Sequence, residues 1–156
     1  MELSDRAREM AECKNAGGSS IQSEVMSFEL FHRCFGATLL QTEMEIGYFP
    51  RGGPMVDYTC EMFGVRLGVS VTRAMKYKAE FENEDAERLL DKKLTGIIDA
   101  TTNAVDKWCK VLHIWATSAK VADTLAAVYK DLCPEVRQDT VVMVTVVTQP
   151  HHPLFR

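Results

Sequence analysis

The segment Val56–Arg73 constrains the fold of this chain more than any other, because two strand patterns flank one short turn at Phe63-Gly64. Polar residues occupy alternate positions in both halves of the segment, and alternate side chains of a strand point to the same face. The polar positions are Asp57, Thr59 and Glu61 in the first half, and Ser70 and Thr72 in the second. We therefore expect a β-hairpin whose two polar faces can meet.

The rest of the chain predicts helices and strands around this hairpin. The expected elements are a helix at Ile21–Phe35, a strand at Ala37–Ile46, a helix from Asn83 to Ile98, a strand at Lys110–Trp115, a helix at Ser118–Leu132 and a strand at Thr140–Thr148. The last strand is apolar at nearly every position, which is typical of a strand covered on both faces. The predicted order is αβββαβαβ, an α/β protein with a mixed central sheet.

Composition predicts one domain with two short tails. The chain has 156 residues, of which 46% are apolar and 26% charged, as in ordinary globular domains. We predict a flexible tail at residues 1–18, the folded domain at 19–149 and a second tail at 150–156. No apolar run approaches the roughly 20 residues that cross a bilayer, so we expect an intracellular protein with no membrane contact.

Charge and cysteine content exclude several classes of site. A net charge of −4 argues against a protein that coats nucleic acid by charge alone. Five scattered cysteines without a C-x-x-C pair predict neither a zinc site nor a disulfide framework. We expect reduced thiols, mostly in the core. His151 and His152 lie between prolines without a further ligand nearby, so a metal role is disfavoured for them.

Two acids and one lysine occupy unusual positions in the predicted elements. Glu24 lies at the amino-terminal end of the apolar face of the first helix. Asp57 begins the hairpin, and Lys93 falls within the apolar stripe of the second helix. Each has an ordinary interpretation too: the helix dipole favours Glu24, turns favour Asp57, and a lysine can lay its stem along apolar surface.

The element order, with a glutamate in the first helix and an aspartate on the second strand, resembles the restriction-endonuclease-like superfamily, the PD-(D/E)XK phosphodiesterases. The resemblance implies a three-layer αβββαβ core, here with an added carboxy-terminal helix and strand. It also implies that Asp57 and Glu24 bind Mg²⁺ and that the protein hydrolyses DNA or RNA. The run Gly68–Lys76 is also similar to a stretch of small uncharacterised protist proteins, which implies no activity.

The resemblance breaks on the third strand, where Ser70-Val71-Thr72 stands in place of the acid-x-lysine motif. Magnesium prefers carboxylate oxygens, and hydrolysis needs a group to prepare the attacking water. Three nearby residues are candidates to replace the missing groups: Glu61 on the face of Asp57, Glu43 on the adjoining strand, and Lys93, because the lysine migrates to a helix within the superfamily. Arg73, Lys76 and Lys78 follow the third strand and are candidates for nucleic-acid contacts.

Three functions remain open on the sequence. The first is a Mg²⁺-dependent endonuclease with a degenerate active site, which uses Asp57, Glu24, Lys93 and Glu61. The second is an inactive pseudo-nuclease that binds nucleic acid or a protein partner. The third is an interaction module in which an exposed edge strand pairs with another subunit, as a homo-oligomer or with a protein partner.

Overall fold

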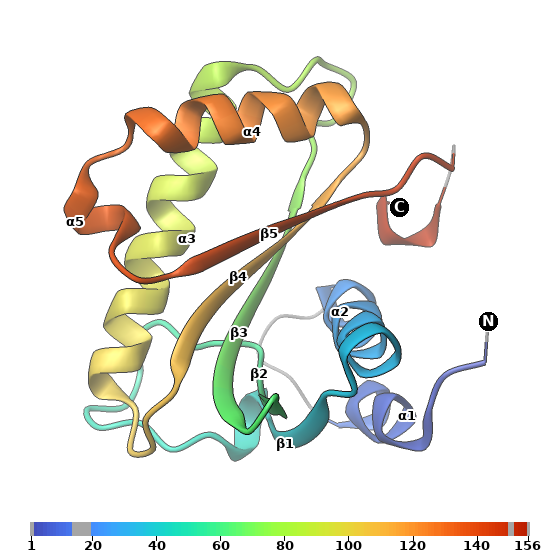
Figure 1. Cartoon of the computed structure of the whole chain (residues 1–156), viewed down its shortest axis with the longest axis vertical. Coiled ribbons are helices and arrows are strands. Elements are labelled where there is room, and N and C mark those ends of the chain that lie inside the picture. Colours follow the sequence, from blue (N-terminus) through green and yellow to red (C-terminus); the bar gives the residue numbers. More distant parts are fainter. Residues whose placement is uncertain (1, 14–19, 150–151, 156) are drawn as a thin grey trace.

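The computed structural model describes residues 2–13, 20–149 and 152–155, and it places helices on both faces of a five-stranded sheet (Figure 1). The helices are α1 (Asp5–Glu12), α2 (Ile21–Phe35), α3 (Asn83–Asn103), α4 (Ala119–Asp131) and α5 (Pro134–Arg137), with 3₁₀ turns η2 (Glu43–Glu45) and η3 (Pro153–Phe155). The strands are β1 (Thr38–Thr42), β2 (Tyr58–Met62), β3 (Val65–Ala74), β4 (Cys109–Ala116) and β5 (Val141–Val146). From α2 to β5 the predicted order αβββαβαβ is confirmed, with the short helix α5 added before β5.

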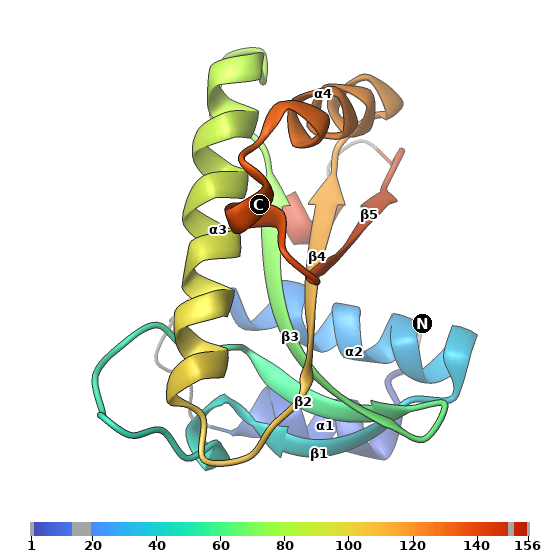
Figure 2. The same ribbon diagram turned by 60° about the vertical axis from the view of Figure 1, so that its left-hand side comes forward.

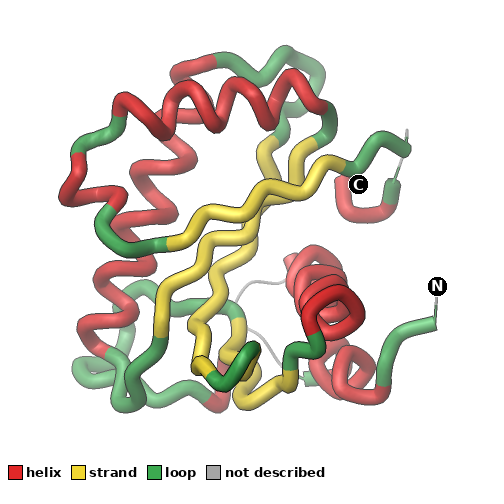
Figure 3. Tube along the Cα trace, in the orientation of Figure 1, coloured by secondary structure: helices red, strands yellow, loops and turns green. Residues whose placement is uncertain are grey.

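The sheet is mixed, with strand order β1-β2-β3-β4-β5 (Figure 3). β2 runs antiparallel to both of its neighbours, whereas β3, β4 and β5 are parallel. Parallel neighbours need a crossover connection, and α3 and α4 supply the two crossovers. The predicted hairpin is β2–β3, with its turn at Phe63 and Gly64, which both have positive φ.

Helices lie on both faces of the sheet (Figures 1 and 2), and an apolar layer lies between each set of helices and the strands. α1 and α2 pack on the face that carries Val69 and Val71 of β3. α3 and α4 pack on the opposite face, which carries Leu112 and Ile114 of β4. The strict alternation along the central strands therefore divides the core between two sets of helices, as the three-layer prediction requires.

Close packing requires glycine at position 68 of the hairpin. A Cβ on Gly68 would come within 2.4 Å of Nε1 of Trp108, so only glycine lets this indole lie against β3. The same Nε1 donates a hydrogen bond to the hydroxyl of Thr101 at 2.9 Å. Trp108 therefore packs the end of α3 onto the hairpin.

Several predicted boundaries differ from the structure. β1 ends at Thr42, so Glu43 lies in the turn η2 and not on a strand. β5 was expected to be covered on both faces, and its side chains do pack on both apolar layers, but it is the edge strand of the sheet and its residues are half-buried or exposed. An apolar run of β-branched residues indicates a strand without saying whether the strand is central or at an edge.

The amino-terminal residues pack more closely than a loose tail would. Ala7 and Met10 of α1 are buried in the core layer of α2, and residues 14–18 of the predicted tail lie outside the described residues. Leu154 of the second predicted tail is also buried. The five cysteines are free thiols, but the expectation that most of them lie in the core was wrong, because Cys60 is buried whereas the other four are exposed. Within the described ranges no helix combines the length and apolar character that would cross a membrane.

Candidate functional site

Glu24 and Asp57, which are far apart in the sequence, meet at the amino-terminal end of α2. Their side chains line the same narrow pocket, and the charge of Glu24 acts on Asp57. The hairpin holds Asp57 in place, because its amide donates to the carbonyl of Val69 at 2.9 Å and its Oδ2 accepts from the amide of Val71 at 2.6 Å. Glu24 is held by the hydroxyl of Ser20, which donates to its Oε1 at 2.7 Å.

A third acid and one lysine lie near this pair. The charge of Glu43 in η2 acts on both Glu24 and Asp57 and favours their neutral forms. The ammonium of Lys93 on α3 acts on the same two carboxyls and favours their ionised forms. We call Glu24, Glu43 and Asp57 the carboxylate cluster. Three chain segments contribute to the cluster, and Lys93 of α3 acts on it from a fourth.

Burial and like charge raise the pKa values of Glu24 and Asp57. Burial, with the charge of Glu24 as the next cause, raises the pKa of Asp57 to about 7. Burial also raises the pKa of Glu24, although the hydrogen bond from Ser20 opposes the shift. Titratable groups whose pKa values are shifted in this way gather at functional sites, so the cluster is the first candidate for a catalytic or binding site.

The cluster lines a narrow, partly open pocket of about 10 Å³, roughly the volume that holds one water molecule. Helix α1 forms the roof of this cavity through Met10, and Cys13 at the end of the helix adds to it. A substrate phosphate is much larger than one water molecule. Access to the carboxyls from this side therefore requires α1 to move.

A larger cavity of about 570 Å³ lies on the other side of Glu43, which lines both spaces. The loop between η2 and β2 forms most of its wall, including Tyr48, Arg51 and Pro54. Burial raises the pKa of Tyr48, and the charges of Asp57 and Glu43 raise it further, so this phenol is electrostatically linked to the cluster. The volume is in the range of small-molecule sites.

The donors of the cluster suit a hard cation in kind but are not arranged around one. Magnesium is commonly held by one or two carboxylates together with water, and Glu24 and Asp57 offer that pair. Within the described part of the chain, no set of three or more histidine, cysteine or acidic side chains is placed to hold a metal ion. On the β3 side the amide of Val71 donates to Asp57, where the superfamily has a carboxylate.

Glu61, Ser70 and Thr72 do not join the carboxylate cluster. Glu61 is exposed near the other end of β2, opposite Arg66 of β3. It lies four residues beyond Asp57, roughly 13 Å along an extended strand. Ser70 pairs with Leu112 and is buried on the α3 face, and Thr72 is half-buried on the same face.

The three predicted nucleic-acid residues already have intramolecular contacts. Nη1 of Arg73 donates to the carbonyl of Leu154 at 3.1 Å. Lys76 forms an ion pair with Asp85 at 3.3 Å, and the ammonium of Lys78 lies 5.2 Å from the ring centre of Tyr77. Lys76 and Lys78 are exposed, whereas Arg73 is half-buried and helps to hold the carboxy-terminal residues.

The two terminal histidines do not join the site either. His152 is half-buried, and its Nδ1 accepts a hydrogen bond from the amide of Leu154 at 3.3 Å. It contacts the turn η3 and not the carboxylate cluster. His151 lies outside the described residues.

The sequence interpretation missed a second polar network inside the core. Nδ1 of His113 and the hydroxyl of Ser27 are 2.6 Å apart, and the hydroxyls of Ser27 and Tyr58 are 2.9 Å apart. Nε2 of His113 lies 2.9 Å from the hydroxyl of Thr145. Burial lowers the pKa of His113 to about 4, so the ring is neutral at pH 7. The ring is 0% exposed, which makes this network structural.

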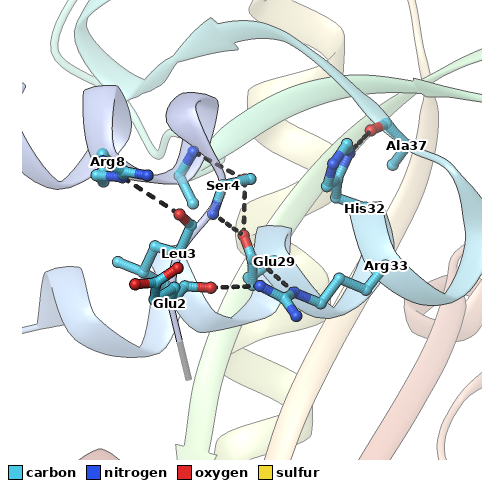
Figure 4. Close-up of polar contacts among 9 residues, drawn as sticks. Glu2, Leu3, Ser4, Arg8, Glu29, His32, Arg33 and Ala37 are labelled. Atoms are coloured by element: carbon cyan, nitrogen blue, oxygen red, sulfur yellow. Dashed lines mark hydrogen bonds and ion pairs between the residues drawn. The ribbon is translucent and has the colours of Figure 1, made fainter.

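A third polar group, centred on Glu29 of α2, holds the amino terminus (Figure 4). Oε2 of Glu29 accepts from the amide of Ser4 at 3.1 Å and from its hydroxyl at 2.7 Å. Arg33 donates both to Glu29 and to the carbonyl of Glu2. We call these four residues the Glu29 clasp. It fixes the segment that leads into α1, and therefore the roof over the carboxylate cluster.

Comparison with known proteins adds a relative without a stated activity. No family model matches the chain, and no solved structure matches it. A protein of Dictyostelium discoideum, the "AAC-rich mRNA clone AAC4 protein", is 41% identical over 155 residues, which cover 94% of this chain. The chain spans 23% of the length of that relative. The argument for function therefore depends on the geometry described above.

Proposed function

We propose that this chain is a divergent, metal-dependent phosphodiesterase domain of the restriction-endonuclease-like kind, which acts on DNA or RNA. One observation carries the proposal: Glu24 of the first core helix and Asp57 at the start of the second core strand converge beside the sheet. The αβββαβ order and the mixed five-stranded sheet agree with the same interpretation.

The proposed roles follow from the position of each side chain. Asp57 and Glu24 hold Mg²⁺, which supplies positive charge to the phosphate in the transition state. Asp57 is fixed by two hydrogen bonds with β3, which keeps its carboxyl oriented without help from a ligand. Lys93 reaches the cluster from α3 and balances negative charge, and Glu43 connects the cluster with the 570 Å³ cavity. Glu61 has no role in this arrangement.

Helix α1 controls access in the proposed reaction. The cavity above the cluster has room for about one water molecule, so α1 must swing away before a phosphate can reach Glu24 and Asp57. The Glu29 clasp is the part of the structure that resists this motion. Opening would also hydrate the two carboxyls and favour their ionised, metal-binding forms.

The absence of the acid-x-lysine motif from β3 favours a second function. Neither Ser70 nor Thr72 can replace an acid or a lysine, and removal of one essential group commonly lowers a catalytic rate by orders of magnitude. On this alternative the domain is a pseudo-nuclease that binds nucleic acid or a protein partner. The exposed Lys76 and Lys78 would then contact phosphates.

Metal titration of the folded protein tests the first proposal. We expect Mg²⁺ or Mn²⁺ to raise the melting temperature of the wild type and of Glu61→Gln, a matched control on the same strand. We expect no rise for Asp57→Asn, because a ligand that binds the native state stabilises it only if the site is intact.

Cleavage of single-stranded, duplex and branched substrates then separates the two functions. Metal-dependent cleavage by the wild type that disappears in Asp57→Asn supports the nuclease. Binding without cleavage, weakened by Lys78→Glu, supports the pseudo-nuclease. A metal response that is identical in wild type and Asp57→Asn contradicts the assignment of the site.

A further inference from the structure

Strand β5 leaves one edge of the sheet open. Its only strand partner in the described part of the chain is β4. Its sequence, Val141-Val142-Met143-Val144-Thr145-Val146, has no charge, no proline and no bulge in its ladder. Val141 is 62% exposed. Unpaired backbone groups on a regular apolar strand are a template for another β-strand.

The opposite edge of the sheet is protected in the ways that natural edges usually are. β1 has five residues, and its ladder with β2 is interrupted between Leu39 and Gln41. Polar side chains occur at Thr38, Gln41 and Thr42. Short length, an irregular ladder and polar side chains all discourage pairing at an edge. Only β5 therefore presents a regular, unprotected edge.

An apolar groove continues from the edge of β5 to helix α4. This cavity of about 410 Å³ is lined by Val142 and Val144 of β5 and by Leu125, Ala126 and Tyr129 of α4. A strand added beside β5 would lie along the mouth of this groove, and alternate side chains of that strand would point into it.

The outer surface of α4 has a charge pattern that is complementary to itself. Ala126 and Ala127 are exposed at its centre, and Asp123 and Lys130 are exposed at equal distances in sequence on either side. Neither charge forms an ion pair within the described chain. In an antiparallel pair of such helices, each Asp123 faces a Lys130, and the small alanines permit close approach.

We propose that β5 and α4 form the interface between two copies of this chain, related by a two-fold axis. The two β5 strands pair antiparallel and join both sheets, while Asp123 of each α4 lies opposite Lys130 of the partner subunit. A second copy fits better than an unrelated strand because a two-fold interface requires one surface to complement itself. Two uncharged β5 strands can pair without repulsion between like charges. The spacing of Asp123 and Lys130 places them opposite each other only when the two α4 helices run antiparallel.

Sedimentation analysis of the full chain across a wide concentration range tests the interface. We expect a dimer for the wild type and a monomer for Val144→Lys, which places a charge at the middle of the strand pair. The matched control Gln41→Lys puts the same charge on the β1 edge and is expected to remain dimeric. A wild type that is monomeric at every concentration overturns the proposal, and so does a Val144→Lys dimer.

Charge exchange on α4 gives a second test at exposed positions, where loss of folding is not expected. The single variants Asp123→Lys and Lys130→Asp should each raise the dimer dissociation constant by roughly five- to tenfold, since each puts like charges opposite one another. The double variant Asp123→Lys/Lys130→Asp restores opposite charges and should return the constant to the wild-type value. A double variant no tighter than the single ones overturns the antiparallel arrangement.

Discussion

Glu24 and Glu29 lie on the same helix and are both buried, at 3% and 0% exposure, but their electrostatic surroundings differ. Burial alone would raise the pKa of Glu29, but hydrogen bonds from Arg33 and Ser4 outweigh burial and hold that pKa below its usual value. Glu24 faces Asp57, and its pKa is raised. Partners that favour its ionised form let Glu29 contribute stability at neutral pH, whereas Glu24 and Asp57 oppose each other's ionisation.

The difference indicates which position serves structure and which is a candidate for function. The Glu29 clasp stabilises the native state through charge-assisted hydrogen bonds. Glu24 and Asp57 of the carboxylate cluster retain like charges in a narrow pocket, an arrangement that destabilises the fold when both groups ionise. Natural proteins keep such arrangements mainly at functional sites, where activity outweighs stability.

The largest expected effect is that of Asp57→Asn on stability at alkaline pH. The folded pKa of Asp57 is about 7 against its usual 3.8, so the native state holds a proton that the unfolded chain releases between these values. The wild type therefore loses stability as pH rises from about 4 to 7, by up to about 4 kcal/mol. Urea unfolding should show Asp57→Asn more stable than wild type at pH 8 and equal to it near pH 4. Equal destabilisation at both pH values would make Asp57 a structural residue.

His113 should show the opposite pH dependence over nearly the same range. Its folded pKa is about 4 against the usual 6.5, so the unfolded state binds the extra proton and native stability falls as pH drops from 6.5 to 4. The loss is about 3 kcal/mol. Comparing unfolding curves of wild type and His113→Gln isolates this contribution from that of Asp57. If His113→Gln loses as much stability in acid as the wild type, other groups cause that loss.

Glu29→Gln and Glu24→Gln test the contrast on α2 directly. We expect Glu29→Gln to lower the free energy of unfolding by about 2 kcal/mol at pH 7, because it weakens hydrogen bonds to Ser4 and Arg33. Since the pKa of Glu29 is lowered by folding, its contribution is present at neutral pH and disappears in acid, as the carboxylate becomes protonated. Glu24→Gln should leave stability at pH 7 unchanged or raised. Hydrogen exchange of the α1 amides should accelerate in Glu29→Gln alone.

The smallest expected effect concerns Lys93. Its charge favours ionised Asp57, so Lys93→Met should shift the titration of Asp57 to higher pH, while global stability changes by less than about 1 kcal/mol. The Asp57 carboxyl can be followed by NMR during a pH titration. Lys92→Met, at the exposed neighbouring position, is the matched control. Equal shifts of the Asp57 titration in the two variants would show that Lys93 has no specific effect on the cluster.

Much of the fold could be predicted because local patterns determine it. Gly36, with φ of 67°, ends α2 where the sequence indicates, and the alternation of β3 sends Val69 and Val71 to one layer as expected. The hairpin was also predictable. The edge position of β5 was not, because strand order depends on how the crossovers pack and not on the residues of the strand.

The residues of the candidate site were likewise only partly predictable from the sequence. The sequence indicated Glu24, Asp57 and Lys93 because each occupies an unusual position in its element. It also suggested Glu61, which lies near the far end of β2, the strand that Asp57 begins, and is remote from the cluster. The Ser27, Tyr58 and His113 network gave no signal, since its members come from three elements and resemble ordinary core residues.

By itself the sequence determined the elements, their order and the division of apolar side chains between two layers, because helix and strand periods are local properties of the chain. Only the tertiary structure decided that two acids share a narrow pocket beside α1, that Arg33 balances the charge of Glu29 while Glu24 faces another acid, and that β5 is left at the edge. Each of these depends on distances between residues remote in sequence, and both electrostatic shifts and strand pairing are set by such distances.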